Sequence, residues 1–189
     1  MSTSTTHSDV ITFLTHQHNE VEDLFTQLEK MEEDTSDEAR RLAEQVVISL
    51  VKHSVAEEIY LYPAVRENVP GGNEIADHEV HEHDEAEQIM KRLESLKPAD
   101  TDFWPTMREL MREIRHHVEE EEGELFPRLR QACSQQQLEE LGKKVQQAEK
   151  IAPTRPHPLS PSEGSALAAA ALGVGLVDRL RDALSGRGR

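Results

Sequence analysis

Residues 53–63 read HSVAEEIYLYP, and residues 117–127 read HVEEEEGELFP. Both stretches contain a histidine followed four positions later by a glutamate, and both end in an aromatic residue and a proline. Because residues four apart lie on the same face of an α-helix, each His–Glu pair can direct an imidazole and a carboxylate at one point. The two stretches therefore predict a metal site between helices.

A single histidine lies upstream of each stretch. His18 and His83 each begin a similar spacing of apolar residues and lie 65 positions apart, whereas the two His–Glu pairs lie 64 positions apart. The chain thus contains an internal duplication, in which each half supplies one lone histidine and one His–Glu pair. We expect four helices that converge on one site.

The composition also favours helices. Of the 189 residues, 36% are apolar, 31% are charged and only 4% are aromatic, which is more typical of amphipathic helices than of a β-sandwich.

The formal net charge is −16, and nucleic-acid binding is not expected because phosphate contacts require a basic surface. Cys133 is the only cysteine, which excludes an internal disulfide and a cysteine-rich metal site. No signal-peptide pattern opens the chain, so we expect a cytoplasmic protein.

Helical spacing of apolar residues predicts where the four helices begin. Ser8 is the expected N-cap of the first helix, and TSDE at residues 35–38 has the form of a capping box for the second. Pro63, together with the PGG sequence at residues 70–72, is expected to end the second helix. The third helix is expected over about residues 73–97, and the fourth from about residue 100.

Histidines and glutamates interrupt the apolar face of each predicted helix. Glu57 and Glu121 share a face with leucine and isoleucine, whereas the rest of the run at residues 119–122 is mostly expected to face solvent. A buried carboxylate without a counter-charge is costly, and no lysine or arginine lies in these faces. Two bound cations would neutralise both carboxylates. The candidate ligands are His18, His53, Glu57, His83, His117 and Glu121.

This ligand set is too large for one four-coordinate zinc ion. It suits two first-row metal ions bridged by the carboxylates, and we expect iron. Imidazole-rich ligation leaves coordination positions open, and two adjacent Fe(II) ions can together give two electrons to O₂ or to a peroxide.

The motifs also form an ordered pattern along about residues 8–131 that resembles the hemerythrin-like (HHE cation-binding) family. The resemblance implies an all-α, up-down-up-down four-helix bundle around an oxo- or hydroxo-bridged di-iron centre. It further implies that Glu57 and Glu121 bridge the ions and that the four histidines are terminal ligands. The pattern comprises Leu14, His18, Val21, Leu24 and Phe25; His53, Glu57, Glu58, Tyr62 and Pro63; Glu82 and His83; and His117, Glu121, Glu122, Phe126 and Pro127.

One position departs from the O₂-carrying members of that family. They have a fifth histidine one turn before the third-helix ligand, where this chain has Glu79. Glu79 has three alternatives: to bind metal, to form a hydrogen bond or to face solvent. An anion here would stabilise Fe(III) and make reversible O₂ carriage less favourable. His78 and His81 are expected to be structural or on the surface, and Tyr60 is a candidate to line the site, although packing is the commoner role.

The remaining segments are expected to lie outside the bundle. Residues 1–7 are predicted to be a disordered tail, residues 132–150 a helical extension and residues 151–165 a proline-rich linker. Residues 166–186 predict an amphipathic helix whose apolar part is too short to cross a bilayer of about 30 Å. Its alternatives are to lie on a membrane surface, to dock on the bundle, or to pair with another chain by self-association or with a protein partner, and we favour docking or pairing because only two basic residues lie within it.

These observations predict a di-iron protein that binds or reduces a small oxidant, namely O₂, H₂O₂ or NO, in sensing or detoxification. The alternative is a non-catalytic module that senses iron or oxygen status, or supplies iron, through its C-terminal segment. The chain has no Rossmann or flavin motif, so sustained reduction would need an external reductant. Peroxide disproportionation would not need an external reductant.

Overall fold

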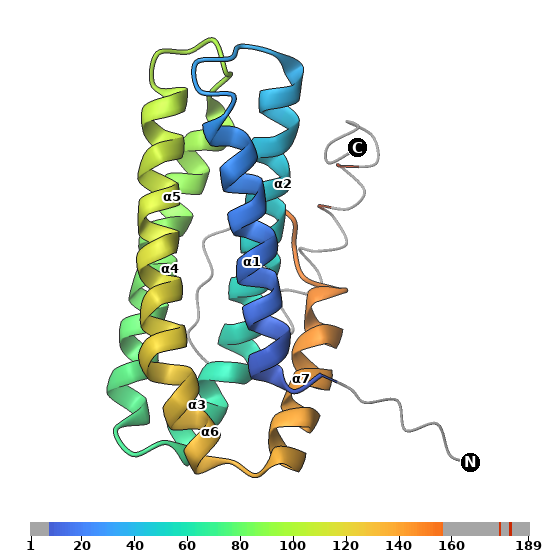
Figure 1. Cartoon of the computed structure of the whole chain (residues 1–189), viewed down its shortest axis with the longest axis vertical. Helices are drawn as coiled ribbons and strands as arrows, with labels where there is room; N and C mark the ends of the chain where they lie inside the picture. The colour runs from blue at the N-terminus through green and yellow to red at the C-terminus, as the bar shows by residue number, and fades with distance from the viewer. Residues whose placement is uncertain (1–7, 157–177, 179–181, 183–189) are drawn as a thin grey trace, which may run out of the picture.

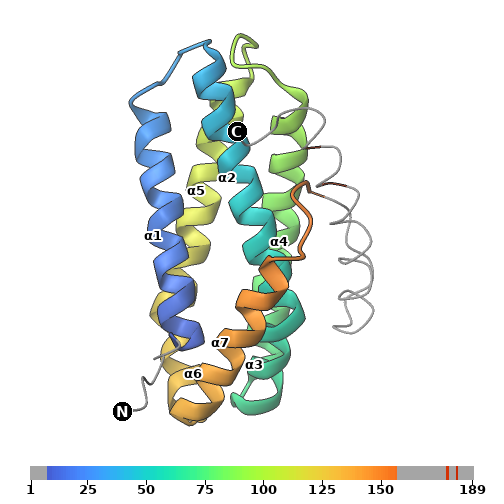
Figure 2. The same cartoon turned by 90° about the vertical axis from the view of Figure 1, so that its right-hand side faces the viewer.

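The computed structural model describes residues 8–156 together with Asp178 and Asp182 (Figures 1 and 2). Within this part of the chain every regular element is helical, and consecutive long helices run in opposite directions along one axis. The expected four-helix bundle is therefore confirmed. Its long helices are α1 (Val10–Glu29), α2 (Asp37–Ala56), α4 (Gly72–Ser95) and α5 (Phe103–Glu120).

The first two helices begin one residue later than expected. Asp9, not Ser8, is the N-cap of α1, and its carboxylate accepts a hydrogen bond from the Thr12 N–H at 2.9 Å. Ser36 caps α2 and accepts from the Ala39 N–H at 3.3 Å. The predicted capping box at residues 35–38 is not formed. Asp34, rather than a glutamate within the helix, accepts the hydrogen bond of the Ser36 N–H at 2.7 Å.

Both His–Glu stretches contain a π-helical turn. α2 leads into η1 (Glu57–Leu61) and then α3 (Tyr62–Asn68), while α5 leads into η2 (Glu121–Leu125) and then α6 (Phe126–Ala132). The Tyr62 N–H bonds the Glu57 carbonyl, and the Phe126 N–H bonds the Glu121 carbonyl, so each turn contains one extra residue. Pro63 therefore does not end the helical run. It lies in the first turn of α3, where a missing N–H is tolerated.

The turn between α3 and α4 requires two glycines. Gly71 has a φ of 73°, in the left-handed region that favours glycine. At Gly72 a β-carbon would lie 2.1 Å from the Val65 carbonyl oxygen, so a larger residue would force the two helices apart. The expected break at residues 70–72 occurs here, and it brings α4 back along α3.

Two large apolar clusters fill most of the bundle, and the predicted metal ligands lie between them. One cluster packs α1, α2, α4 and α5 towards the ends where α1 joins α2 and α4 joins α5. The other gathers α3, α6 and the start of α1, and α7 (Gln135–Glu149) covers it through Leu138 and Val145 (Figure 2). Each predicted ligand thus lies in a helix that apolar packing holds on both sides.

After α7 the chain runs back along the bundle. Ala152 is fully buried, and Asp178 accepts hydrogen bonds from the backbone N–H groups of Thr154 at 3.2 Å and Arg155 at 3.1 Å. Apart from residues 151–156, Asp178 and Asp182, the predicted linker at 151–165 and amphipathic helix at 166–186 lie outside the described residues, as does the predicted tail at 1–7. No described helix is both long enough and apolar enough to cross a bilayer.

Candidate metal centre

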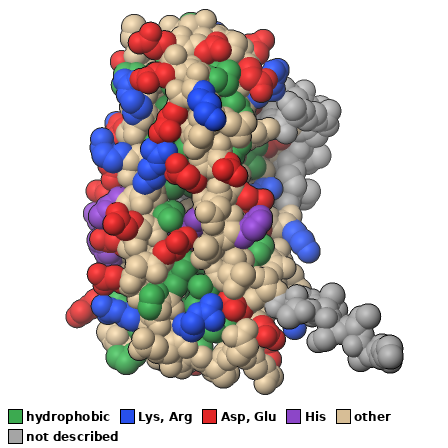
Figure 3. Space-filling model, viewed as in Figure 1, with side chains coloured by type: hydrophobic (Ala, Val, Ile, Leu, Met, Phe, Trp, Pro, Cys, Tyr) green, Lys and Arg blue, Asp and Glu red, His purple; other side chains and the backbone are tan. Residues whose placement is uncertain are grey.

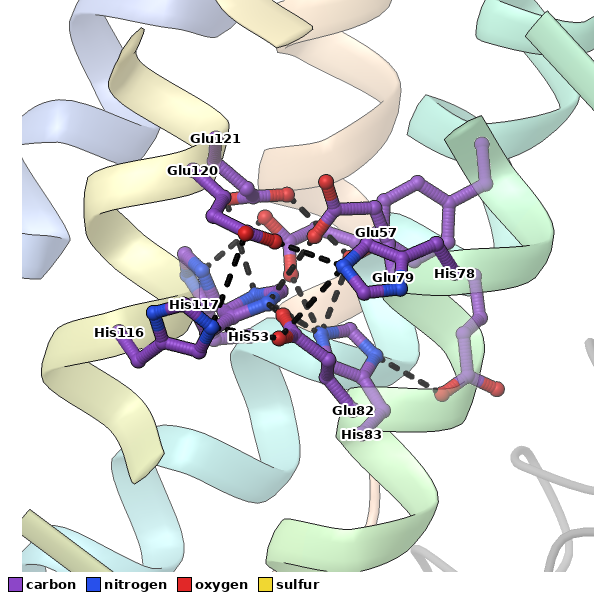
Figure 4. Close-up of polar contacts among 12 residues, drawn as sticks. His53, Glu57, His78, Glu79, Glu82, His83, His116, His117, Glu120 and Glu121 are labelled. Carbon is purple, nitrogen blue, oxygen red and sulfur yellow. Dashed lines mark hydrogen bonds and ion pairs between the residues drawn. The ribbon is translucent and has the colours of Figure 1, made fainter. Parts of the chain in front are cut away.

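The structure brings all six predicted ligands together in the middle of the bundle, and Figure 4 labels all of them except His18. Each of the four long helices provides one histidine, and the two glutamates open the two π-helical turns. Glu57 and Glu121 have no exposed surface, and the histidines are buried as well. The contributing elements are α1 for His18, α2 for His53, α4 for His83, α5 for His117, η1 for Glu57 and η2 for Glu121.

The four imidazoles form two pairs. The Nε2 atoms of His18 and His53 are 3.2 Å apart, and those of His83 and His117 are also 3.2 Å apart. Two ligands of one first-row ion with bonds of about 2.1 Å lie roughly 3 to 3.4 Å apart. Each pair can therefore bind one ion through its Nε2 atoms.

The two buried carboxylates connect these pairs. Glu57 places Oε1 3.0 Å from His53 Nε2 and Oε2 3.5 Å from His83 Nε2. Glu121 places Oε2 3.4 Å from the Nε2 of His18 and 3.8 Å from that of His117. Each carboxylate thus reaches one imidazole of each pair, as a bridging ligand would.

Three of the four oxygens of these carboxylates lack ordinary hydrogen-bond donors among the described residues. Both side-chain oxygens of Glu57, and Oε2 of Glu121, are buried and accept no well-aligned hydrogen bond from the described residues. Leaving buried carboxylate oxygens unpaired is costly, and a cation removes that cost. The residues present therefore fit a pair of metal ions.

The second glutamate of each Glu-Glu doublet holds a histidine from the other half of the duplication. Glu122 lies 2.8 Å from His18 Nδ1, and Glu58 lies 3.1 Å from His83 Nδ1. Such outer partners orient a ligating imidazole and leave its Nε2 free for metal. Glu122 is exposed, as expected, but it also contacts His18, and the repeated doublet was the available signal for that second role.

The residue before each lone histidine holds the histidine of the His–Glu pair. Gln17 Oε1 lies 2.9 Å from His53 Nδ1, and Glu82 Oε2 lies 2.9 Å from His117 Nδ1. Glu79 is buried and places its Oε2 3.1 Å from the same His117 nitrogen. Of the three alternatives for Glu79, facing solvent is excluded, and contact with the outer nitrogen of His117 is observed.

Charges in the metal-free protein compete with burial. Burial acts to raise the pKa of Glu57, but His53 and His83 hold it well below its usual range. Burial acts to lower the pKa of His83, but Glu57 and Glu58 raise it to about 9. Burial likewise opposes protonation of His117, yet its pKa lies well above the usual range because Glu121, Glu79 and Glu82 surround it. The metal-free cluster therefore holds protons that bound cations would replace.

Tyr62, rather than Tyr60, lines the site. The Tyr62 hydroxyl lies 3.0 Å from His83 Nε2 and donates to Glu121 Oε1 at 3.2 Å, whereas Tyr60 is half-buried and packs against apolar residues. The extra residue in the π-helical turn brings Tyr62 to the face that carries Glu57. Burial and the charge of Glu121 raise the pKa of Tyr62, so its phenol stays protonated.

The other histidines considered from the sequence lie outside the buried cluster. His81 is exposed and lies 3.6 Å from Glu85 on the same helix. His78 is also exposed, and its Nε2 lies 2.7 Å from Glu120. Neither contacts a predicted ligand.

A cavity of about 220 Å³ leads to the cluster between α1, α2 and α5. Its lining includes all four ligand histidines and Lys52. This volume exceeds the roughly 30 Å³ that one water molecule occupies in the liquid, so a diatomic gas or a peroxide can approach the imidazoles.

Comparison with known proteins identifies the family. The sequence model of the hemerythrin HHE cation-binding domain matches residues 9–129. An uncharacterised hemerythrin-like protein of Schizosaccharomyces pombe is 31% identical over 147 residues, which make up 77% of this chain and 72% of that protein. A DNA nickase of Nostoc sp. is 30% identical over 128 residues, covering 65% of this chain but only 34% of the nickase.

A solved structure has the same fold. The crystal structure of a hemerythrin HHE cation-binding domain-containing protein from Mycobacterium kansasii superposes with a TM-score of 0.65 at 18% identity. The match covers 76% of this chain and 86% of the other. Together with the buried histidines and glutamates that can bind metal, these matches show that the chain belongs to the hemerythrin HHE cation-binding family.

Proposed function

We propose that this is a non-haem di-iron protein that binds or reduces a small oxidant, namely O₂, H₂O₂ or NO. The observation that carries the proposal is the sharing of two buried carboxylates between two imidazole pairs. The six proposed ligands offer fewer donor atoms than two six-coordinate ions require, so positions stay open for a small ligand. Bound as Fe(II), the two ions supply two electrons.

The surroundings of His117 favour reduction over reversible O₂ carriage. Its outer nitrogen faces two carboxylates, those of Glu79 and Glu82, at 3.1 and 2.9 Å. An anionic partner makes an imidazole a stronger donor and stabilises the higher charge of Fe(III). The oxidised pair is therefore the favoured resting state.

Tyr62 keeps a proton at the centre. Its hydroxyl lies between His83 Nε2 and Glu121 Oε1, and its raised pKa keeps it protonated at neutral pH. Reduction of H₂O₂ to two water molecules consumes two electrons and two protons. Continued reduction needs an external reductant, whereas disproportionation of two H₂O₂ into O₂ and two water molecules balances without one.

The test uses the purified full chain. We expect two iron ions per chain, and we expect the optical spectrum of the anaerobically reduced protein to change when O₂, H₂O₂ or NO is added separately. Peroxide consumption and O₂ evolution, recorded together, distinguish disproportionation from reduction. A single metal ion per chain, or an unchanged spectrum with all three oxidants, would contradict the proposal.

A second candidate function is metal or oxygen sensing through the C-terminal segment. Pro153, Arg155 and Pro156 line a crevice between α2 and α4 that reaches His83 and its partner Glu58. Arg155 donates hydrogen bonds to both Asp178 and Asp182, and the Thr154 N–H donates to Asp178, so these two C-terminal aspartates are joined to the residues beside His83. Hydrogen exchange at residues 151–156 should then differ between metal-free and iron-loaded protein, and equal exchange would argue against sensing.

A further inference from the structure

A second group of histidines and glutamates lies on the surface beside the buried centre (Figure 4). His78 and Glu82 come from α4, and His116 and Glu120 come from α5. Each pair has the same four-residue spacing as the buried His–Glu pairs, but on the outer side of two neighbouring helices. Histidine side chains also reach the surface at mid-height of the bundle in Figure 3.

We propose that these four side chains bind a divalent first-row cation such as Zn²⁺, Co²⁺ or Fe²⁺. His116 Nε2 lies 3.6 Å from Glu82 Oε1 and 3.6 Å from Glu120 Oε1, and His78 Nε2 lies 3.7 Å from Glu82 Oε1. Ligands of one tetrahedral ion with bonds of about 2.1 Å lie about 3.4 Å apart. Each of these separations lies within about 0.3 Å of that value, and the ligand atoms of His78, Glu82 and Glu120 all lie within 4.8 Å of one another, with His116 beside them.

The distance between His78 and Glu120, and the exposure of the two histidines, agree with this assignment. His78 Nε2 lies 2.7 Å from Glu120 Oε2, a hydrogen bond that opens by less than 1 Å when both atoms bind an ion. The side chains of His78 and His116 are 53% and 56% exposed, so a hydrated cation can reach them. Glu82, at 14%, is mostly covered and forms the inner wall of the site.

The duplicated half of the chain lacks this group. At the offsets that relate the two halves, the corresponding residues are Phe13, Gln17, Lys52 and Ala56. None of them carries an imidazole or a carboxylate, and Lys52 would repel a cation. The surface group is therefore a feature of the α4–α5 side and does not follow from the duplicated fold.

Two carboxylates connect the surface group to the buried centre. Glu82 directs Oε1 at His78 and His116, and its Oε2 lies 2.9 Å from His117 Nδ1. Beside it, the Glu79 side chain is only 4% exposed, and its Oε2 accepts no well-aligned hydrogen bond within the described part of the chain. Glu79 thus shares the outer nitrogen of His117 with Glu82, and a buried carboxylate beside a set of metal ligands is a place where a cation is stabilised.

The position of Glu79 and Glu82 assigns the surface group a role in metal uptake. A cation captured by the exposed histidines meets successive carboxylates on its way to His117 and Glu121. This uptake role rests on the metal centre of the proposed function, whereas cation binding at the surface does not. Clustered negative charge of this kind also raises the rate at which cations arrive.

The binding test uses the full chain already loaded with iron. We expect calorimetry to show one additional Co²⁺ bound per chain, with the strong visible absorption of tetrahedral Co²⁺. The variant His78→Ala/His116→Ala should lose this binding. The matched variant His16→Ala/His81→Ala should retain it, since each of its histidines faces only a single glutamate, at 3.5 and 3.6 Å respectively.

The uptake test follows Fe²⁺ incorporation into metal-free protein. We expect His78→Ala/His116→Ala to take up iron about tenfold more slowly than the wild-type protein and the matched variant, and to reach the same final content. Circular dichroism verifies that both variants fold. Equal uptake rates would overturn the uptake role, and equal Co²⁺ binding by both variants, or no additional Co²⁺ in the wild type, would overturn the site.

These outcomes separate the two proposals. If the wild-type protein holds two iron ions but no additional cobalt, the surface site alone fails. If the wild-type protein holds no iron yet binds cobalt that depends on His78 and His116, the surface site stands and the di-iron proposal fails.

Discussion

The two imidazole pairs share a fold but not their surroundings. The first half-site, His18 and His53, and the second half-site, His83 and His117, occupy equivalent positions of the duplication. The outer nitrogen of His53 faces a neutral amide, whereas that of His117 faces two carboxylates. Duplication therefore reproduced the ligands while their partners diverged, and the two half-sites should differ chemically.

The aromatic neighbours of the two half-sites also differ, and again the second half-site is the more polar. Phe126 stacks on the His18 ring with centroids 5.8 Å apart, whereas Tyr62 places a hydroxyl 3.0 Å from His83 Nε2. The first half-site thus has an apolar wall, and the second has a proton donor and additional negative charge. Oxidised metal should be stabilised more strongly at the second half-site than at the first.

Removing a ligand histidine from either half-site should have the largest effect. We expect His53→Ala and His117→Ala each to reduce the iron content well below two ions per chain, because each half-site has only two imidazoles. Glu57→Ala should reduce occupancy at both half-sites, since its oxygens face His53 and His83. Metal analysis measures the loss, with His16→Ala as the exposed control. Two iron ions retained in a His53→Ala/His117→Ala variant would rule out the proposed ligands.

Metal uptake should release protons and weaken as the pH falls. His83 has a pKa of about 9 in the metal-free protein, so it is protonated at about pH 7.5. Its raised pKa stabilises the metal-free fold fully below about pH 6.5, and this contribution is lost as the pH rises through about 9. Because metal binds the neutral ring, each pH unit below about 9 should cost roughly tenfold in affinity for each proton displaced.

A pH-indicator dye during anaerobic Fe²⁺ addition measures this release directly. His83→Ala should release fewer protons per ion than the wild type. Metal binding without any change in dye absorbance between about pH 6.5 and 8 would contradict the charge assignment of the second half-site.

Exchanging the outer partners should sharpen the contrast between the half-sites. Glu82→Gln gives His117 a neutral amide at the position equivalent to Gln17 and leaves Glu79 as its one carboxylate partner, and Gln17→Glu gives His53 a carboxylate partner. Loss of an outer partner typically costs roughly 10–100-fold in metal affinity. We expect Glu82→Gln to weaken metal binding and raise the reduction potential, and Gln17→Glu to lower that potential. Spectroelectrochemical titration provides the measurement, and shifts of the same sign in both variants would argue against a role for partner charge.

Replacing Tyr62 by phenylalanine should have the smallest effect on the folded protein. The substitution removes the hydroxyl that donates to Glu121 and makes the two aromatic neighbours alike. We expect about 1–2 kcal/mol less stability to denaturant, two iron ions still bound, and slower peroxide consumption. Tyr60→Phe is the matched control and should behave as the wild type in all three measurements. Unchanged peroxide kinetics in Tyr62→Phe would remove this phenol from the proposed chemistry.

The grouping of the ligands could be predicted because its signals are local. Four-residue spacing orients His53 with Glu57 and His117 with Glu121 on any helix, and the repetition of that spacing indicates that both pairs serve one site. Bound cations could also be predicted from the sequence, because Glu57 and Glu121 lie on apolar helix faces that carry no lysine or arginine. Local spacing does not, however, say which nitrogen of an imidazole faces inward.

The amino-acid sequence by itself thus determined four amphipathic helices, the duplication and the six residues that meet in the bundle. Tertiary structure decided the rest. The π-helical turn, whose extra residue brings Tyr62 rather than Tyr60 into the site, interrupts regular helical periodicity and so is not read from the spacing of residues. The pairing of Glu122 with His18, and the surface group formed by His78 and His116, depend on which faces of separate helices touch. The contacts between helices are determined by the burial of the apolar faces of all the helices together, and the local spacing of residues does not specify them.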